Sequence, residues 1–198
     1  MEENNVTARY RIVMIGGSAG SLDVILKIID ELPVTLSVPL VVVLHRKSTT
    51  DTILVDLLGS KTSLRVKEAE EKEPIQPGHL YIAPADYHLL IEKDGTFSLD
   101  DSEKVNYSRP SIDVSFESAA DAYGPAVIAV LLSGANTDGV EGLREVKEHG
   151  GLTIVQEPHT AEVDYMPRQA IKKVAIDVVA GADALGTVLR ELVQDARK

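Results

Sequence analysis

Three polar side chains in this sequence could together carry out nucleophilic catalysis, and each follows a short apolar run. Ser18 stands in Gly16-Gly17-Ser18-Ala19-Gly20, between a predicted strand and a predicted helix. A Gly-x-Ser-x-Gly turn in this setting is tight enough to expose the serine hydroxyl, and the helix start offers N–H groups to an oxyanion. His45 and Asp138 follow two other apolar runs. A serine, a histidine and an aspartate are the groups of an acyl-transfer triad.

Each of these residues also has an interpretation without catalysis. The glycine-rich turn could hold an anion or a nucleotide, although it matches neither the dinucleotide fingerprint nor the Gly-Lys-Ser/Thr ending of a P-loop. A single histidine at a strand end is commonly a polar terminus. Asp138 and Glu141 fit a capping box, and Asp113 fits the first turn of another helix. Taken one at a time, these residues leave the alternatives open.

The elements that would position these side chains follow from the apolar pattern. Continuous apolar runs predict buried strands at 11–15, 40–44, 80–83, 126–132 and 152–156. Helical periodicity predicts helices at 21–31, 52–58, 111–123, 138–148 and 182–196. Residues 89–99, around Asp94-Gly95, predict a β-hairpin insertion. We therefore expect an α/β fold in a single domain, with a doubly wound, mostly parallel sheet flanked by helices.

This architecture would bring the three side chains together. Ser18, His45 and Asp138 each follow the carboxyl end of a different predicted strand. In a doubly wound sheet these ends meet at one rim, where ligands bind. The chain order Ser, His, Asp differs from that of α/β-hydrolases, but triads are defined by geometry and role, so the order excludes nothing.

Composition excludes several other classes of protein. The chain has 198 residues, no cysteine, and a net charge of −11 from 20 Lys and Arg against 31 Asp and Glu. Cysteine nucleophiles and thiolate metal sites are therefore impossible. The acidic excess argues against a nucleic-acid partner. The other histidines, His88 among them, are expected in solvated positions without metal-ligand spacing. The apolar runs are shorter than the ~18 residues that cross a bilayer, and the first residues lack a secretory signal, so we expect a cytoplasmic protein without membrane insertion.

Several blocks of the sequence resemble, in order, the catalytic domain of the chemotaxis protein-glutamate methylesterase family, CheB. The blocks are Gly16-Gly17-Ser18-Ala19-Gly20, His45, Glu68, Pro77-Gly78-His79-Leu80-Tyr81-Ile82-Ala83-Pro84, Arg109-Pro110-Ser111-Ile112-Asp113, Leu132-Ser133-Gly134, Thr137-Asp138-Gly139 and Met166-Pro167-Arg168. The resemblance implies a serine hydrolase that removes methyl groups from glutamates of chemoreceptor cytoplasmic domains or similar signalling proteins, and that can deamidate particular glutamines.

The resemblance also implies a role for individual residues. Ser18 would be the nucleophile, His45 the base and Asp138 the orienting carboxylate. The backbone N–H groups of Ala19 and Ala135 would stabilise the oxyanion. No metal and no organic cofactor would be needed.

The chain departs from the family pattern at several places. Ser21 replaces a usual glycine, Ala135 a methionine, 46–49 a proline-rich loop, and Tyr165 a glycine. We expect 46–49 and Tyr165 to line the approach to the serine and to affect the choice of substrate. Residues 1–10 would be an N-terminal tail and 11–198 the methylesterase domain, with no receiver domain in this chain. The alternative is a non-catalytic signalling or binding module that retains the fold.

Overall fold

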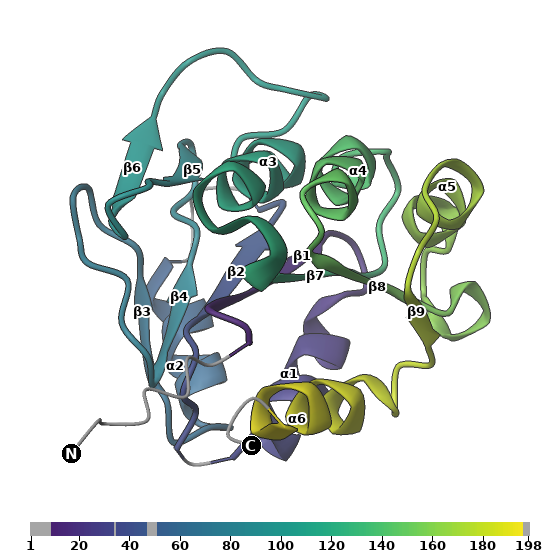
Figure 1. Cartoon of the computed structure of the whole chain (residues 1–198), viewed down its shortest axis with the longest axis horizontal. Helices are drawn as coiled ribbons and strands as arrows, with labels where there is room; N and C mark the ends of the chain where they lie inside the picture. The colour runs from purple at the N-terminus through teal and green to yellow at the C-terminus, as the bar shows by residue number, and fades with distance from the viewer. Residues whose placement is uncertain (1–8, 34, 47–50, 196–198) are drawn as a thin grey trace, which may run out of the picture.

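A seven-stranded sheet forms the centre of the molecule, which we describe from a computed structural model covering residues 9–33, 35–46 and 51–195 (Figure 1). The strand order is β3-β4-β2-β1-β7-β8-β9, and every pair is parallel. The strands are β1 (Ile12–Gly17), β2 (Leu40–Leu44), β3 (Arg65–Glu68), β4 (His79–Ile82), β7 (Val127–Leu131), β8 (Leu152–Gln156) and β9 (Val178–Ala180). The predicted parallel, doubly wound sheet is confirmed.

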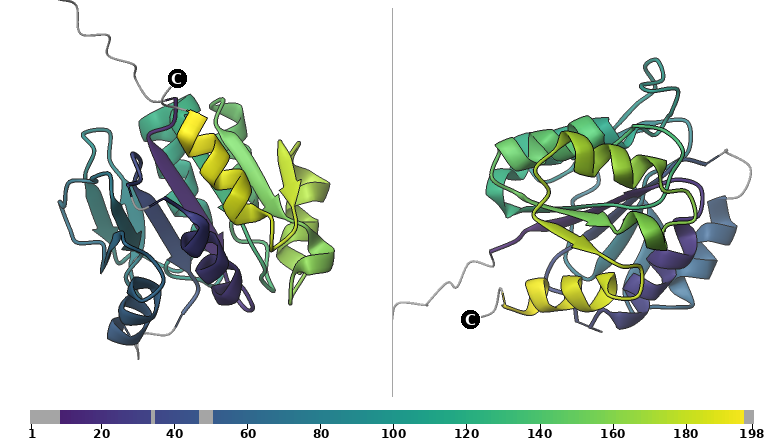
Figure 2. Two further views of the ribbon diagram at one scale, coloured as in Figure 1. Left: turned by 90° about the horizontal axis from the view of Figure 1, so that it is seen from below. Right: turned by 90° about the vertical axis from the view of Figure 1, so that its right-hand side faces the viewer.

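Helices cover both faces of this sheet. They are α1 (Leu22–Glu31), α2 (Asp51–Gly59), α3 (Ile112–Tyr123), α4 (Val140–Glu148), α5 (Tyr165–Lys173) and α6 (Leu185–Asp195). One face carries α3, α4 and α5, and the other carries α1, α2 and α6 (Figures 1 and 2). None of the helices in the described part of the chain has the length and apolar composition that crossing a bilayer requires.

Two separate apolar cores lie between the sheet and the helices, one on each face of the sheet. Along β1, Met14 packs under α3 and α4, whereas Val13 and Ile15 pack toward α1 and α6. Every residue of β1, β2 and β7 is buried. A parallel strand covered on both faces requires apolar residues at consecutive positions, which is why these strands could be predicted from continuous apolar runs.

The predicted hairpin is confirmed as a separate two-stranded sheet of β5 (His88–Ile91) and β6 (Phe97–Asp100). It is attached to α3 by two hydrogen bonds. The Ile91 N–H donates to the Ser118 hydroxyl at 3.0 Å, and the Ser115 hydroxyl donates to the Leu89 carbonyl at 2.7 Å. These bonds pair backbone groups of a strand edge that the main sheet does not cover.

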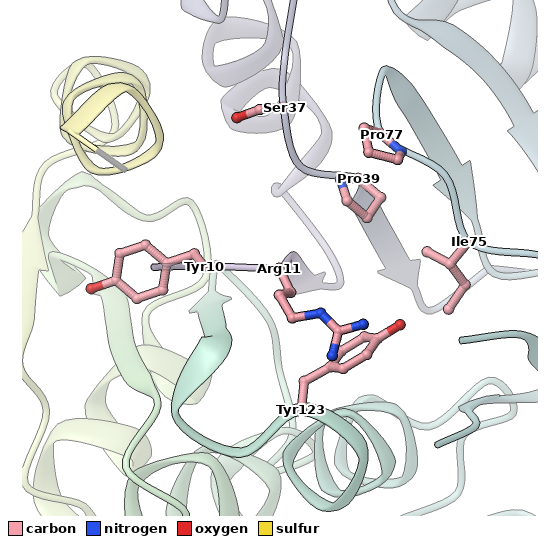
Figure 3. A pocket seen from close by; sticks show the side chains of 7 residues that line it. All are labelled: Tyr10, Arg11, Ser37, Pro39, Ile75, Pro77 and Tyr123. Carbon is pink, nitrogen blue, oxygen red and sulfur yellow. The ribbon is translucent and has the colours of Figure 1, made fainter. Parts of the chain in front are cut away.

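A cavity of about 320 Å³ opens at the amino-terminal edge of the sheet. Figure 3 shows its lining residues, Tyr10, Arg11, Ser37, Pro39, Ile75, Pro77 and Tyr123. The Arg11 guanidinium lies over the Tyr123 ring, 4.3 Å from its centroid. Because Arg11, Pro39 and Pro77 precede parallel strands, this cavity lies at the edge opposite the one where Ser18 follows β1.

Candidate active site

Ser18, His45 and the loop that contains Asp138 follow three neighbouring strands. In the central parallel strands, Gly17 of β1 pairs with Leu44 of β2, and Gly16 pairs with Leu131 of β7. The structure therefore places the three segments side by side at the carboxyl edge of the sheet. This edge, beside the central strand of a doubly wound sheet, is the position where such folds bind ligands.

The turn at Ser18 is tight and held from both sides. The Ser18 N–H donates to the Ser133 carbonyl at 2.9 Å. The Ser18 carbonyl accepts from the backbone N–H of Ser21 at 3.1 Å and from its hydroxyl at 2.6 Å. Gly20 has φ +75, and a methyl group on Gly17 would lie 2.5 Å from the Ser21 hydroxyl. The small residues are thus needed for the backbone path, and the peptide between Ser18 and Ala19 is fixed.

The loop after β7 packs directly against this turn. A methyl group on Gly134 would lie 3.1 Å from Cβ of Ser18 and 2.4 Å from Cε of Met166. The Ser133 hydroxyl donates to the Ala19 carbonyl at 2.7 Å, which ties the two loops together. Among the described residues, the N–H groups of Ala19 and Ala135 donate to no protein acceptor, and both residues are exposed. Two unpaired backbone donors therefore flank the serine, as an oxyanion site requires.

His45 lies against Asp138. Its Nε2 is 2.6 Å from Oδ2 of Asp138, and the side chains are 13% and 0% exposed. With Nε2 engaged, Nδ1 is the ring nitrogen left for a proton from a nucleophile. Within the described part of the chain the Ser18 hydroxyl has no hydrogen-bond partner. Catalytic hydrogen bonds are often long in unliganded enzymes and tighten when substrate binds.

Asp138 is held by further donors. Its Oδ1 accepts from the Ser111 hydroxyl at 2.7 Å and from the Asp113 N–H at 3.1 Å, and its Oδ2 accepts from the Ile112 N–H at 2.7 Å. Burial alone would raise the pKa of Asp138, but the bonds from His45 and these donors lower it below its ordinary value. The carboxylate is therefore ionised and can orient the imidazole.

The predicted capping box at Asp138 is wrong. The N-cap of α4 is Gly139, with φ +98, and it is not capped by Asp138. Asp138 instead accepts N–H groups at the start of α3, while Oδ1 of Asp113 accepts from Gly139 and Gly142 at the start of α4, both at 2.8 Å. We call this arrangement the exchanged caps. Sequence reading missed it because each aspartate caps the helix distant from it in the chain, not its own.

Asp113 is the second buried carboxyl group of the exchanged caps. Burial raises its pKa to about 7, and the charge of Asp138 acts in the same direction. The N–H groups of Gly142 and Gly139 oppose this shift. Its Oδ2 accepts from the Asn106 side chain at 2.7 Å.

One histidine near the site differs from expectation. His88, predicted to be solvated, is 1% exposed, because its Nδ1 accepts from the Ser111 N–H at 3.1 Å and its Nε2 lies 2.9 Å from the Glu103 carbonyl. Arg46 pairs with Glu68, and 47–49 lie outside the described residues. Tyr165 is partly exposed at the start of α5. No metal-binding group of three or more His, Asp or Glu side chains occurs in the described part of the chain.

Comparison with known proteins assigns the chain to a family. The model of the CheB methylesterase family matches residues 13–189. This chain belongs to the CheB methylesterase family. The CheB-family chain is therefore an ester hydrolase.

Relatives and a solved structure extend this assignment. A putative protein-glutamate methylesterase/protein-glutamine glutaminase of Leptospira interrogans is 44% identical, over 94% of this chain and 96% of its own length. A protein-glutamate methylesterase/protein-glutamine glutaminase of Thermotoga maritima is 39% identical, over 92% of this chain and 54% of its own. The crystal structure of the Thermotoga maritima CheB methylesterase catalytic domain superposes with a TM-score of 0.89 at 38% identity, over 93% of this chain and 99% of that one.

Proposed function

We propose that this CheB-family protein hydrolyses γ-methyl esters of glutamate side chains on chemoreceptor cytoplasmic domains or similar signalling proteins. Relatives that carry the name protein-glutamate methylesterase support this substrate class. The observation that carries the mechanism is the 2.6 Å contact between His45 and the buried Asp138, beside the Ser18 turn. We place the activity in a methylesterase domain of residues 11–198.

The proposed reaction has two halves. Nδ1 of His45 takes the hydroxyl proton while Oγ of Ser18 attacks the γ-carbonyl carbon, and the N–H groups of Ala19 and Ala135 stabilise the tetrahedral oxyanion. The histidine then gives its proton to the methoxide, and methanol leaves an acyl-enzyme. Water, deprotonated by the same histidine, hydrolyses this ester and regenerates Ser18. Asp138 offsets the imidazolium charge in both halves.

The same groups also support deamidation. The relatives' names include protein-glutamine glutaminase. A glutamine side chain presents the same γ-carbonyl, and ammonia would leave in place of methanol with the proton from His45. The proposal therefore covers two reactions, hydrolysis of the methyl ester and deamidation of glutamine.

Replacement of the nucleophile tests the proposed function. We expect Ser18→Ala to lower kcat for methanol release from a methylated receptor domain by about 10⁴- to 10⁶-fold, as loss of a triad nucleophile does. It should also abolish labelling by a fluorophosphonate, because this reagent requires an activated hydroxyl. Ser60→Ala, at an exposed serine just after α2, is the matched control and should label normally. A Ser18→Ala variant that retains more than about a tenth of the activity would exclude Ser18 as the nucleophile.

A further inference from the structure

A tight turn near the proposed active site has an unusual backbone. Val105 and Ser108 bond to each other in both directions, at 3.2 and 2.9 Å, so that Asn106 and Tyr107 are the two central residues of a hairpin turn. Both have positive φ, 49 and 63. Positive φ at both central positions is the mark of a type I′ turn, which strongly prefers asparagine followed by glycine. Here tyrosine stands at the glycine position.

Within the described residues, no contact of the Tyr107 side chain compensates for this choice. An aromatic residue with positive φ is a true outlier, whereas asparagine tolerates the region. Tyr107 is 97% exposed, and within the described residues its ring and hydroxyl have no partner. Residues held in such conformations gather at active sites, ligand clamps and switch regions, where the strain is part of the mechanism.

The turn is joined to the proposed catalytic groups. The Asn106 side chain donates to Oδ2 of Asp113 at 2.7 Å, and Asp113 donates its N–H to Asp138. On the other side, the Asn136 side chain donates to the Ser108 hydroxyl at 3.4 Å. Asn136 directly follows Ala135, a proposed oxyanion donor. Tyr107 is therefore exposed on a turn that borders the oxyanion loop.

The segment that carries the turn is anchored at its base. Arg109 donates to the carbonyl groups of Asp101 and Ser102, both at 2.6 Å, and His88 lies against the Glu103 carbonyl. Between β6 and α3 the segment stands away from the sheet in both Figure 1 and the right-hand view of Figure 2. The fold thus presents Tyr107 outward on a positioned support, which lowers the ordering cost of a contact made there.

We propose that Tyr107 is a specificity-determining residue that contacts the protein substrate, with its ring packed on the polypeptide segment that flanks the methylated glutamate. This inference rests on the proposed function. Tyrosine suits such a contact because it offers a large, amphipathic area with few rotatable bonds. A small ester has no flanking segment, so only the protein substrate should depend on Tyr107.

Substitution of Tyr107 separates substrate binding from turn structure. We expect Tyr107→Gly to raise KM for a methylated receptor cytoplasmic domain about tenfold. Hydrolysis of p-nitrophenyl acetate should stay within about twofold, since Ser18 and His45 are untouched. The same variant should raise Tm by roughly 2 to 4 °C, because glycine is preferred at this turn position. Tyr107→Phe should keep most of the affinity, and Val179→Ala, at an exposed apolar residue on β9, is the matched control.

The possible outcomes distinguish this inference from the proposed function. An active enzyme whose KM for the receptor domain is unchanged in Tyr107→Gly would overturn the inference alone. Equal losses on the receptor domain and on the small ester would also overturn it, because they would show that the residue only supports the oxyanion loop. A wild-type enzyme that releases no methanol from receptor domains would overturn the proposed function and this inference with it.

Discussion

The three proposed catalytic side chains are held to very different degrees. Within the described residues the Ser18 hydroxyl makes no hydrogen bond, whereas the Asp138 carboxylate contacts His45 and accepts from Ser111, Ile112 and Asp113. A nucleophile must be free to attack and a carboxylate that orients a base must not turn, so this difference matches the proposed roles.

The raised pKa of Asp113 predicts a pH-dependent stability. As pH rises from about 4 to about 7, the unfolded chain loses this proton while the folded chain retains it, so this group lowers the free energy of unfolding across that range. Asp113→Asn lacks the titration. The measurement is the free energy of unfolding of wild type and of Asp113→Asn, from urea unfolding at pH 5 and at pH 8. We expect the value of wild type minus that of Asp113→Asn to fall by about 1 to 3 kcal/mol between pH 5 and pH 8.

A control separates this effect from general changes of charge. Asp101→Asn changes an exposed aspartate of the β6–α3 segment, and its difference from wild type should vary much less. Asp138, whose pKa is lowered, contributes stability that is lost only as pH falls below its ordinary range near 4, outside this window. A constant difference between wild type and Asp113→Asn would contradict the prediction.

At the level of residues, types and spacing indicated where catalytic chemistry belongs but not how its groups are bonded. Ser18, His45 and Asp138 could be singled out because each follows an apolar run. Ser111 and Gln156, both fully buried, could not be singled out in this way, because their structural role depends on hydrogen-bond partners that are distant in sequence. The Gln156 side chain accepts from the Ser133 N–H at 3.0 Å and so supports the loop after β7, a contact that periodicity does not reveal.

At the level of elements, the loop after β7 has little room beside β1. A methyl group on Gly134 would approach both Met166 and Ser18. We expect Gly134→Ala to lower stability by about 1 to 3 kcal/mol, because added volume in a packed site displaces its neighbours. Ester hydrolysis should fall by more than about tenfold, since the displaced loop carries Ala135, a proposed oxyanion donor.

A second glycine offers the control for this change. Gly59 ends α2, and a methyl group there would meet only Val66, at 4.0 Å. Gly59→Ala should leave kcat/KM unchanged. Equal effects of the two substitutions on ester hydrolysis would show that the close approach at Gly134 has no catalytic consequence.

The elements that sequence reading found and missed differ in burial. The central strands β1, β2 and β7 were found because burial on both faces makes them continuously apolar. The edge strands β3 and β9 were missed, since each has a neighbour on one side only and is partly exposed. Helix α5 was missed as well, because it buries only Met166, Pro167 and Ala170 and carries a proline in its first turn.

On the scale of the whole molecule, one sheet joins two cores. Ile25 of α1 belongs to one core and Phe116 of α3 to the other, and both residues are fully buried. We expect Ile25→Ala and Phe116→Ala each to lower the free energy of unfolding by about 2 to 5 kcal/mol. Because both cores pack on the same strands, each variant should still unfold in one transition.

Two measurements test this cooperativity. Urea unfolding followed by far-UV circular dichroism and by loss of fluorophosphonate labelling should give the same midpoint in each variant. A Phe116→Ala protein that loses labelling well before its helices melt would show instead that the α3 side, which carries the exchanged caps, unfolds by itself.

The exchanged caps also constrain how this sequence can change over evolutionary time. A substitution at Asp138 would remove an acceptor from the start of α3 as well as the partner of His45. Loss of activity through this position would therefore also lower the stability of the fold. Within the described residues the Ser18 hydroxyl makes no hydrogen bond, so its loss removes no such structural contact. Descendants that keep this fold only as a binding scaffold should therefore lose the serine first and retain both aspartates.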